Sequence, residues 1–146
     1  MLLLGSIAST LTHADPAQCP SFKATETVRV AKVYDGDTVR LQDGRKIRFI
    51  GIDTPELAKN KPQRYTPNQP FAEAAKNYLI SLFDKHGWQL QLMPDQEASD
   101  KYGRYLFHLQ LSNGLNLQQQ LLNQGLAVAY TTPPNQLFAD CYIASE

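Results

Sequence analysis

Acidic residues cluster in two short turns of the chain's first half, where they could bind a hard cation. Asp35 and Asp37 flank a glycine in one turn, and Asp53 and Glu56 enclose Thr54–Pro55 in the other. Calcium takes about six to eight oxygen ligands, mostly carboxylates, carbonyls and water. Because Asp and Gly are also favoured turn formers, the first motif alone favours an ordinary turn over a metal site.

Basic residues accompany these acidic turns. Arg48 lies inside an apolar stretch, where a guanidinium either extends to solvent or meets an anion. An extended chain from Arg48 to Asp53 covers roughly 16 Å, so their meeting requires a bend, such as one at Gly51. The segment Asp100–Arg104 holds a lysine, a tyrosine and an arginine around a glycine. It could grip a phosphate and a sugar or base, although a solvated turn is the simpler explanation.

The elements that would position these residues form a strand-rich domain. Valine-rich or apolar, β-branched content predicts strands at residues 27–34, 38–41 and 46–52, and apolar alternation predicts strands at 88–92 and 105–111. Helical spacing predicts a helix from Pro70, and the capping pair Asn116 and Gln119 predicts a second, short helix. Asp43-Gly44 predicts a type I′ hairpin turn, and residues 57–69 read as a long exposed loop. We therefore expect an α+β fold with two to three helices, whose sheet a five-stranded OB-fold β-barrel would close.

The composition is that of one globular domain. With 146 residues and 42% hydrophobic residues, the chain can bury a single core. The 14 basic and 14 acidic residues cancel, which argues against a generally basic DNA-coating protein. The segment 23–64 nevertheless holds ten basic against six acidic residues. This excess would attract a polyanion, and chance clustering of solvated charges is the alternative.

The N-terminal fourteen residues carry no Asp, Glu, Lys or Arg and contain a run of apolar and small residues. They are too short to span a bilayer and are typical of the apolar part of a secretory signal, although its positive region is missing. A packed N-terminal strand or helix is the alternative. On the first interpretation, residues 1–18 are a signal-peptide remnant and leader. Residues 19–146 are then the domain of a secreted or periplasmic protein without a membrane segment in its mature form.

Cys19 and Cys141 are the only cysteines of the chain. An exported protein permits one intramolecular disulfide between them, and two buried thiols that never meet are the alternative. Their spacing is unsuited to a zinc site, which needs more ligands in close pairs. The sequence shows no coiled-coil pattern, so we expect a monomer.

Three motifs in the same order and at similar separations resemble the staphylococcal-nuclease-like, or thermonuclease, family. They are residues 34–39 (YDGDTV), 48–56 (RFIGIDTPE) and 100–104 (DKYGR), and residues 123–127 (NQGLA) also agree. The resemblance covers about residues 27–140. It implies an OB-fold barrel of five strands with helices, and calcium-dependent cleavage of phosphodiester bonds in DNA and RNA.

The resemblance also implies a metal site and a general base. Asp37 and Asp53 would bind calcium, with the backbone carbonyl of Thr54 as a further ligand. Asp35 matches an aspartate that supports the metal site. Glu56 would act as general base on the attacking water.

The remaining motif residues match positions that contact the substrate. Arg48 and Arg104 would hold the phosphate and stabilise the charge of the transition state. Lys101, Tyr102 and Tyr130 resemble positions that contact the nucleotide. A strand of DNA or RNA is therefore the expected partner.

The chain departs from the family pattern near its C-terminal end. The stretch from Ala127 to Tyr130 is one residue short, and Thr132 stands where a second tyrosine can occur. The family's last helix continues past the position of Glu146, so we expect only a fragment of that helix. Two other functions stay open: a non-catalytic module of the same fold that binds nucleic acid or protein, and a calcium-stabilised structural module.

Overall fold

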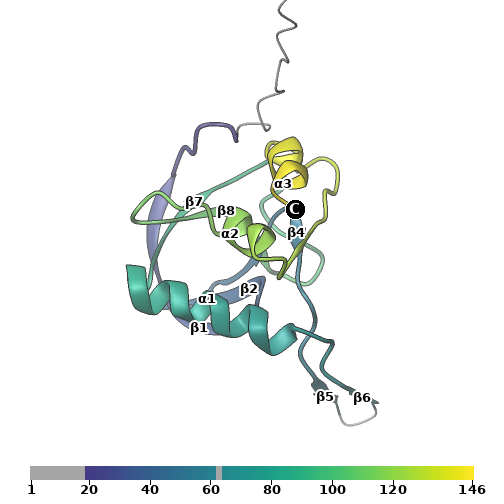
Figure 1. Cartoon of the computed structure of the whole chain (residues 1–146). Coiled ribbons are helices and arrows are strands. Elements are labelled where there is room, and N and C mark those ends of the chain that lie inside the picture. The colour runs from purple at the N-terminus through teal and green to yellow at the C-terminus, as the bar shows by residue number, and fades with distance from the viewer. Residues whose placement is uncertain (1–18, 62–63) are drawn as a thin grey trace, which may run out of the picture.

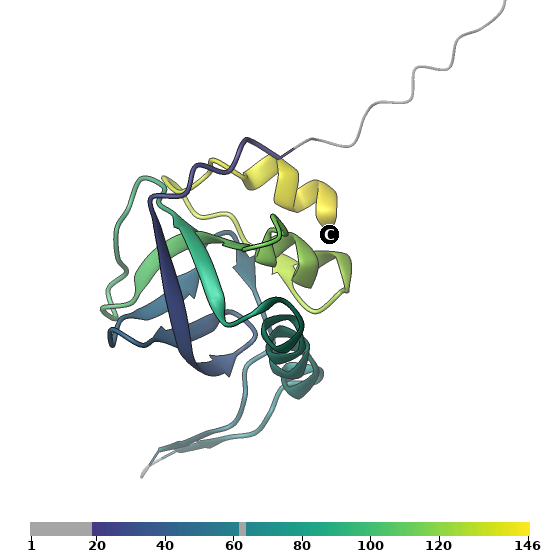
Figure 2. The ribbon, with the colours of Figure 1, turned by 90° about the vertical axis from the view of Figure 1, so that its left-hand side faces the viewer.

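A closed five-stranded barrel forms the centre of the computed structural model, which describes residues 19–61 and 64–146 (Figures 1 and 2). Around the barrel the strands follow the order β1 (Glu26–Asp35), β2 (Thr38–Leu41), β3 (Lys46–Phe49), β8 (Tyr105–Leu111) and β7 (Gln89–Met93). Strands β3 and β8 are parallel, and the other neighbours are antiparallel. The predicted α+β fold with a five-stranded barrel is confirmed. The predicted signal segment lies outside the described residues.

Helices and two small two-stranded sheets complete the domain. The helices are α1 (Ala72–His86), α2 (Leu117–Asn123) and α3 (Ala139–Ser145). The small sheets pair β4 (Ile52–Asp53) with β9 (Val128–Ala129), and β5 (Lys59–Lys61) with β6 (Arg64–Thr66). In Figures 1 and 2, α1 and α3 lie on opposite sides of the domain, and the β5–β6 ribbon extends away from it. No helix within the described residues is long and apolar enough to span a membrane.

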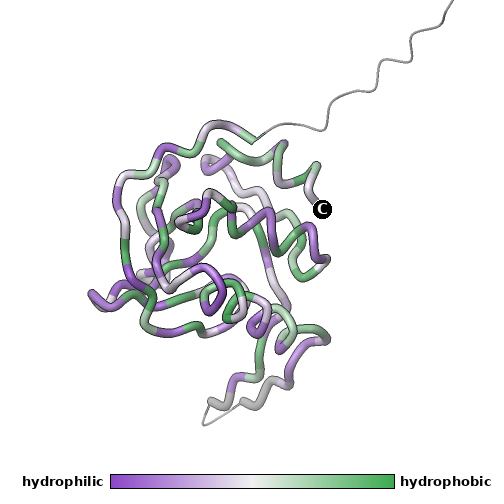
Figure 3. The backbone as a smooth tube through the Cα atoms, turned by 60° about the vertical axis from the view of Figure 1, so that its left-hand side comes forward, coloured by the Kyte–Doolittle hydropathy of each residue, from purple (hydrophilic) through white to green (hydrophobic). Residues whose placement is uncertain are grey.

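Alternating side chains of the barrel strands fill the core. Val33, Val39 and Ile47 point inward from three successive strands and are buried. Helix α1 closes one end of the barrel with buried residues at helical spacing: Ala72, Ala75, Leu79, Leu82 and Phe83. Figure 3 shows the same alternation as hydrophobic and hydrophilic segments along the backbone. Each fully buried large aliphatic side chain contributes about 1.5–3 kcal/mol.

The hairpin between β2 and β3 differs from the predicted type I′ turn. A type I′ turn needs positive φ at both central residues. Gly44 has a φ of 96°, but Asp43 has a negative φ, since Phe71 is the only residue other than glycine with positive φ in the described part of the chain. The Gly44 amide donates to the Leu41 carbonyl at 3.1 Å, and the Leu41 amide donates to the Arg45 carbonyl at 2.8 Å. This is a type I turn followed by a left-handed glycine. One glycine supplies one positive φ at low cost, so Asp43 keeps an ordinary conformation.

The loop before α1 also differs from its prediction. Residues 57–69 were expected to be a loop without secondary structure, but they contain β5 and β6. The helix begins at Ala72 rather than at Pro70, and Phe71 precedes it with a φ of 66°. Gly87, with a φ of 92°, follows the last helical residue as predicted.

A disulfide joins Cys19 to Cys141 of α3, with a Cα–Cα distance of 4.9 Å. The bond connects residues that lie 122 positions apart, so it ties the described N-terminal segment to the last helix. Of the two alternatives for these cysteines, the structure has the disulfide.

Helix α3 also contributes to a buried polar network. The Tyr142 hydroxyl lies 2.9 Å from Nδ1 of His108, and Nε2 of His108 lies 2.9 Å from a carboxylate oxygen of Asp95. Burial lowers the pKa of His108 below its usual value, while the hydrogen bond and the charge of Asp95 oppose this shift. A neutral imidazole therefore donates from Nε2 to Asp95 and accepts from Tyr142. His108 has a structural role in joining α3 to β8.

Gly51 is required by the contact between α3 and the turn after β3. Its φ is 82°, and a Cβ there would lie 2.5 and 2.7 Å from two ring carbons of the buried Tyr142. We expect Gly51→Ala to destabilise the protein by about 2–4 kcal/mol, from backbone strain and overpacking together. Gly44→Ala is the matched control, because Gly44 also has positive φ but no atom within 4 Å of the added Cβ. Urea unfolding that shows equal losses for both variants would contradict the role of the Tyr142 contact.

Candidate active site

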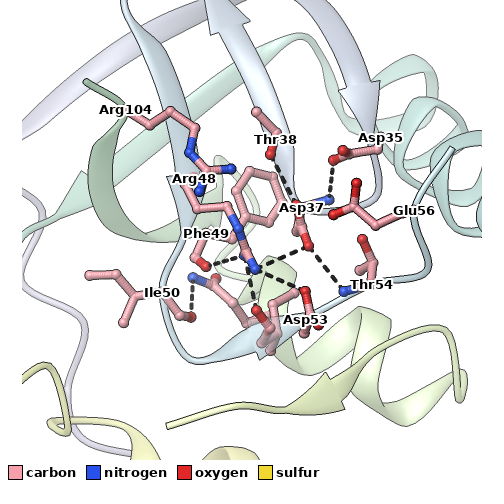
Figure 4. A network of polar contacts seen from close by, with 12 residues as sticks. Asp35, Asp37, Thr38, Arg48, Phe49, Ile50, Asp53, Thr54, Glu56 and Arg104 are labelled. Atoms are coloured by element: carbon pink, nitrogen blue, oxygen red, sulfur yellow. Dashed lines mark hydrogen bonds and ion pairs between the residues drawn. The ribbon is translucent and has the colours of Figure 1, made fainter. Parts of the chain in front are cut away.

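Arg48 holds together the bend between β3 and β4 (Figure 4). Its Nη1 donates to the carbonyls of Phe49 and Ile52 at 2.8 and 2.9 Å. Its Nη2 lies 3.1 Å from Oδ1 of Asp53 and 3.3 Å from Oδ2 of Asp37. The guanidinium therefore bridges two carboxylates from separate turns. The bend that the sequence requires between Arg48 and Asp53 is present.

Asp35, Asp37, Asp53 and Glu56 lie together and form an acidic cluster (Figure 4). Asp37 is its buried member. Its side chain is 3% exposed, whereas that of Asp53 is 51% exposed. Asp37 accepts hydrogen bonds from the Thr38 hydroxyl at 2.9 Å and from the Thr54 amide at 3.0 Å. These donors and Arg48 compensate the cost of burying its charge. Asp37 thus fixes the β1–β2 turn against the segment that follows β4.

The carboxylates of the cluster repel one another. Burial, followed by the charge of Asp37, raises the pKa of Asp35 to about 6. Burial also raises the pKa of Asp53, while the neighbouring charge of Arg48 opposes this shift. Glu56 contributes to the raised pKa of both aspartates. A cation placed among these groups would relieve their repulsion.

Glu56 is anchored through its backbone at the base of the β5–β6 ribbon. Its amide donates to Oε1 of Gln69 at 2.8 Å, and the Gln69 amide donates to the Glu56 carbonyl at 2.8 Å. Its carboxylate forms an ion pair with Lys59. In Figure 4 the side chain points toward Asp35 and Thr54. Gln69 and Lys59 were not predicted from the sequence, although the three-residue spacing of Glu56 and Lys59 is compatible with a local ion pair.

A cavity of about 220 Å³ lies beside the acidic cluster, on the other side of Arg48. Arg48, Arg104 and Tyr130 line it together, and Tyr130 is 60% exposed. Glu97 and Asn135 also line it, and Nδ2 of the Asn135 side chain donates to the Glu97 carboxylate at 3.3 Å. Nothing in the sequence indicated these two residues, because their separation of 38 residues has no local pattern. The lining thus holds two cations and an aromatic ring, which suit a phosphate and a base, and two carboxylates, of which Asp100 pairs with Arg104.

The turn Asp100–Arg104 positions the second arginine. Asp100 accepts from the amides of Tyr102 and Arg104 at 2.9 and 3.0 Å, and from Nε of Arg104 at 2.7 Å. Tyr102 is 70% exposed, and its ring lies 5.2 Å from Nζ of Lys101 and 5.4 Å from Cζ of Arg104. Lys101 and Tyr102 are not among the residues that line the cavity. They belong to the same turn as Arg104, outside the cavity.

The donors near Asp37 fit a hard cation only in part. Within the described residues, no three His, Cys, Asp or Glu side chains converge on one position. Asp37 and Asp53 supply oxygen atoms, and the buried hydroxyl of Thr54 has no hydrogen-bond partner in the described part of the chain. Oxygen-only donors suit calcium better than a soft metal. The protein would supply part of the shell, and water and phosphate oxygens would supply the rest.

Comparison with known proteins agrees with this arrangement. A sequence profile described as "Staphylococcal nuclease homologue" matches residues 46–146. The thermonuclease of Staphylococcus intermedius is 37% identical over 116 residues, which are 77% of this chain and 65% of that protein. The thermonuclease of Staphylococcus hyicus is 31% identical over 118 residues, covering 79% and 66%. Endonuclease YhcR of Bacillus subtilis is 32% identical over 125 residues, which are 82% of this chain and 10% of that protein.

The chain thus spans about two thirds of the length of the two thermonucleases and a small part of YhcR. The profile match includes Arg48, Asp53, Glu56 and Arg104, and the barrel topology is the one that the resemblance implies. Both observations lead to the same assignment. This chain belongs to the staphylococcal nuclease homologue family.

Proposed function

We propose that this protein is a calcium-dependent endonuclease that hydrolyses phosphodiester bonds of DNA and RNA. The observation that carries this function is the position of Arg48, whose guanidinium contacts Asp37 and Asp53 and also lines the cavity that contains Arg104. A phosphate in that cavity would lie beside the acidic cluster. Similarity to proteins named thermonuclease and endonuclease supports the same function.

Hydrolysis of a phosphodiester requires neutralisation of its charge before a nucleophile can approach. Arg48 and Arg104 would donate hydrogen bonds to the phosphate oxygens and stabilise the additional charge of the transition state. Calcium, held by Asp37, Asp53 and the Thr54 carbonyl, would supply Lewis-acid polarisation of the phosphate. The two arginines, with the cation that the acidic residues would hold, would therefore bind the phosphate more tightly in the transition state than in the ground state.

Glu56 would take the proton from the attacking water. As this water forms its bond to phosphorus, its proton passes to the Glu56 carboxylate, and the bond to the leaving oxygen breaks. The leaving oxygen departs as an alkoxide, which takes up a proton from solvent, and Glu56 later returns its own proton to solvent. The paired backbone hydrogen bonds with Gln69 keep Glu56 in place without using its side chain. The carboxylate therefore keeps its position. It becomes available for proton transfer when the bound substrate displaces Lys59 from its ion pair with Glu56.

We also propose that the protein acts outside the cytoplasm, as a secreted or periplasmic monomer. The Cys19–Cys141 disulfide supports this location, because such bonds persist in oxidising compartments. The apolar N-terminal residues agree with export.

Calcium binding tests the metal part of this function independently of cleavage. At a calcium concentration about ten times Kd, we expect the Tm of the protein to rise by roughly 5 °C. The Asp37→Asn and Asp53→Asn variants should lose this rise. Asp140→Asn is the matched control, since Asp140 lies exposed on α3. A parent protein whose Tm is unchanged by calcium would contradict the metal site.

A further inference from the structure

Three basic residues lie opposite one another on the outer face of the barrel, away from the cavity. The strand register pairs Lys32 of β1 with Arg40 of β2, and Arg40 with Lys46 of β3. All three side chains are exposed. None of them forms an ion pair with another described side chain. Like charges directly opposite in neighbouring strands destabilise a sheet, so stability does not explain this row.

Nearby acidic residues are already neutralised by another cation. Arg45, in the β2–β3 turn, contacts Glu26 at 2.7 Å and Asp43 at 2.8 Å. The hydrogen bonds from Arg45 keep the pKa of both carboxyl groups below the ordinary value, and burial opposes this shift. Arg45 is thereby compensated, whereas the row Lys32, Arg40 and Lys46 keeps its positive charge.

Tyr34 adds an aromatic ring to this row. Nζ of Lys32 lies 5.0 Å from the centre of its ring, and Nζ of Lys46 lies 4.5 Å from it. Both ammonium groups are within cation–π distance, which holds them over the sheet. Cations that bind phosphates beside an aromatic ring that stacks on a base are the usual components of a single-strand binding surface. The outer face of these strands is also where OB-folds bind oligonucleotides.

The basic row is continuous with the candidate active site. The neighbouring row of the same sheet consists of Asp35, Thr38 and Arg48, which are paired by the same register. Arg40 lies two residues after Thr38, and Lys46 lies two residues before Arg48, so each is about 7 Å from that row. A strand whose phosphate contacts Arg48 therefore needs to continue only a short way over the sheet to meet the basic row.

We propose that Lys32, Tyr34, Arg40 and Lys46 form an extension subsite for single-stranded nucleic acid beyond the scissile phosphate. The three cations bind backbone phosphates, and a base stacks on Tyr34. This role deepens the nuclease function proposed above and rests on it. Long single strands therefore bind more tightly than a substrate of one nucleotide.

A triple variant, Lys32→Gln with Arg40→Gln and Lys46→Gln, tests the subsite. For a long single-stranded DNA, we expect KM to rise about tenfold or more. The slope of log kcat/KM against log salt should become shallower by about 2, because each of the three lost phosphate contacts contributes roughly 0.7 to that slope. For a nitrophenyl phosphodiester of thymidine, which reaches only the site around Arg48, KM should stay unchanged.

The control variant removes the same charge elsewhere. Lys23→Gln with Lys76→Gln and Lys85→Gln changes cations outside the outer face of β1–β3, at the N-terminal segment and on α1, and should leave both substrates unaffected. An unchanged KM for the long strand in the first triple variant would overturn the subsite. An equal loss on both substrates would overturn it as well, since the effect would then lie in the catalytic centre.

Fluorescence anisotropy of the long strand, measured in chelator, tests binding by the basic row separately from the nuclease activity. If the parent cleaves neither substrate, the nuclease function fails, and the anisotropy still decides whether the basic row binds the strand. We expect the first triple variant to lose about tenfold in affinity and the control variant to lose little. Equal affinity for both variants would exclude the basic row as a nucleic-acid surface.

Discussion

Replacement of Glu56 by glutamine should lower kcat for single-stranded DNA by about 10²–10⁴ and leave KM nearly unchanged. Glutamine has the same shape but cannot accept the proton of the attacking water. The backbone hydrogen bonds that fix this position to Gln69 do not involve the side chain and remain. Steady-state cleavage in saturating calcium, with Tm as a check on folding, measures the effect.

Glu97→Gln is the matched control for this loss. Glu97 also carries a carboxylate and lines the cavity with Arg48 and Arg104, but it belongs to no family motif identified above. Its replacement should alter KM at most a few-fold and leave kcat near that of the parent. A Glu56→Gln variant that retains the parent's kcat, or a Glu97→Gln variant that loses as much, would exclude Glu56 as the general base.

Loss of the disulfide should have the largest effect on stability. We expect the double variant Cys19→Ser, Cys141→Ser to be less stable than the oxidised parent by about 2–5 kcal/mol. The bond closes a loop between residues 122 positions apart, so its absence frees a large part of the unfolded chain. Urea unfolding of the oxidised parent, the reduced parent and the double variant measures this difference.

The disulfide also holds helix α3, which packs against the turn and the small sheet that carry residues of the candidate active site. Helix α3 places Tyr142 against Gly51, and the Glu146 carboxylate accepts from the Ala129 amide at 3.1 Å. Ala129 lies in β9, which pairs with the strand that carries Asp53. Below its own Tm, the double variant should therefore cleave DNA with nearly the parent's kcat, and heating should inactivate it first. Unfolding midpoints that coincide in oxidised and reduced protein would contradict a stabilising role.

The barrel was predictable because its strands bury one face. Apolar residues at every second position of β2, β7 and β8 mark an inward face that the structure confirms. In β1 the alternation breaks after Val30, where the register shifts and Val33 becomes the next inward residue. Capping was also readable, since Asn116 accepts from the Gln119 amide at 3.0 Å. Polar segments were less informative. The β5–β6 ribbon has no apolar alternation, and the third predicted strand ends at Phe49 because the chain turns at Gly51.

Only part of the candidate site could be predicted from the residues themselves. The sequence showed that Arg48 needs a bend to meet Asp53, but not that the guanidinium would bind the carbonyls of Phe49 and Ile52 to hold that bend. Catalytic roles came from family resemblance. Cavity residues such as Asn135 come from distant segments of the chain, and single-sequence patterns carry no information on such contacts.

Cleavage of single-stranded DNA by the oxidised protein, in calcium and in chelator, tests the proposed function most directly. We predict fragments in calcium and intact DNA in chelator, because the carboxylates and arginines of the site need the cation to bind and polarise the phosphate. Intact DNA in calcium, or equal cleavage in chelator, would contradict a calcium-dependent nuclease.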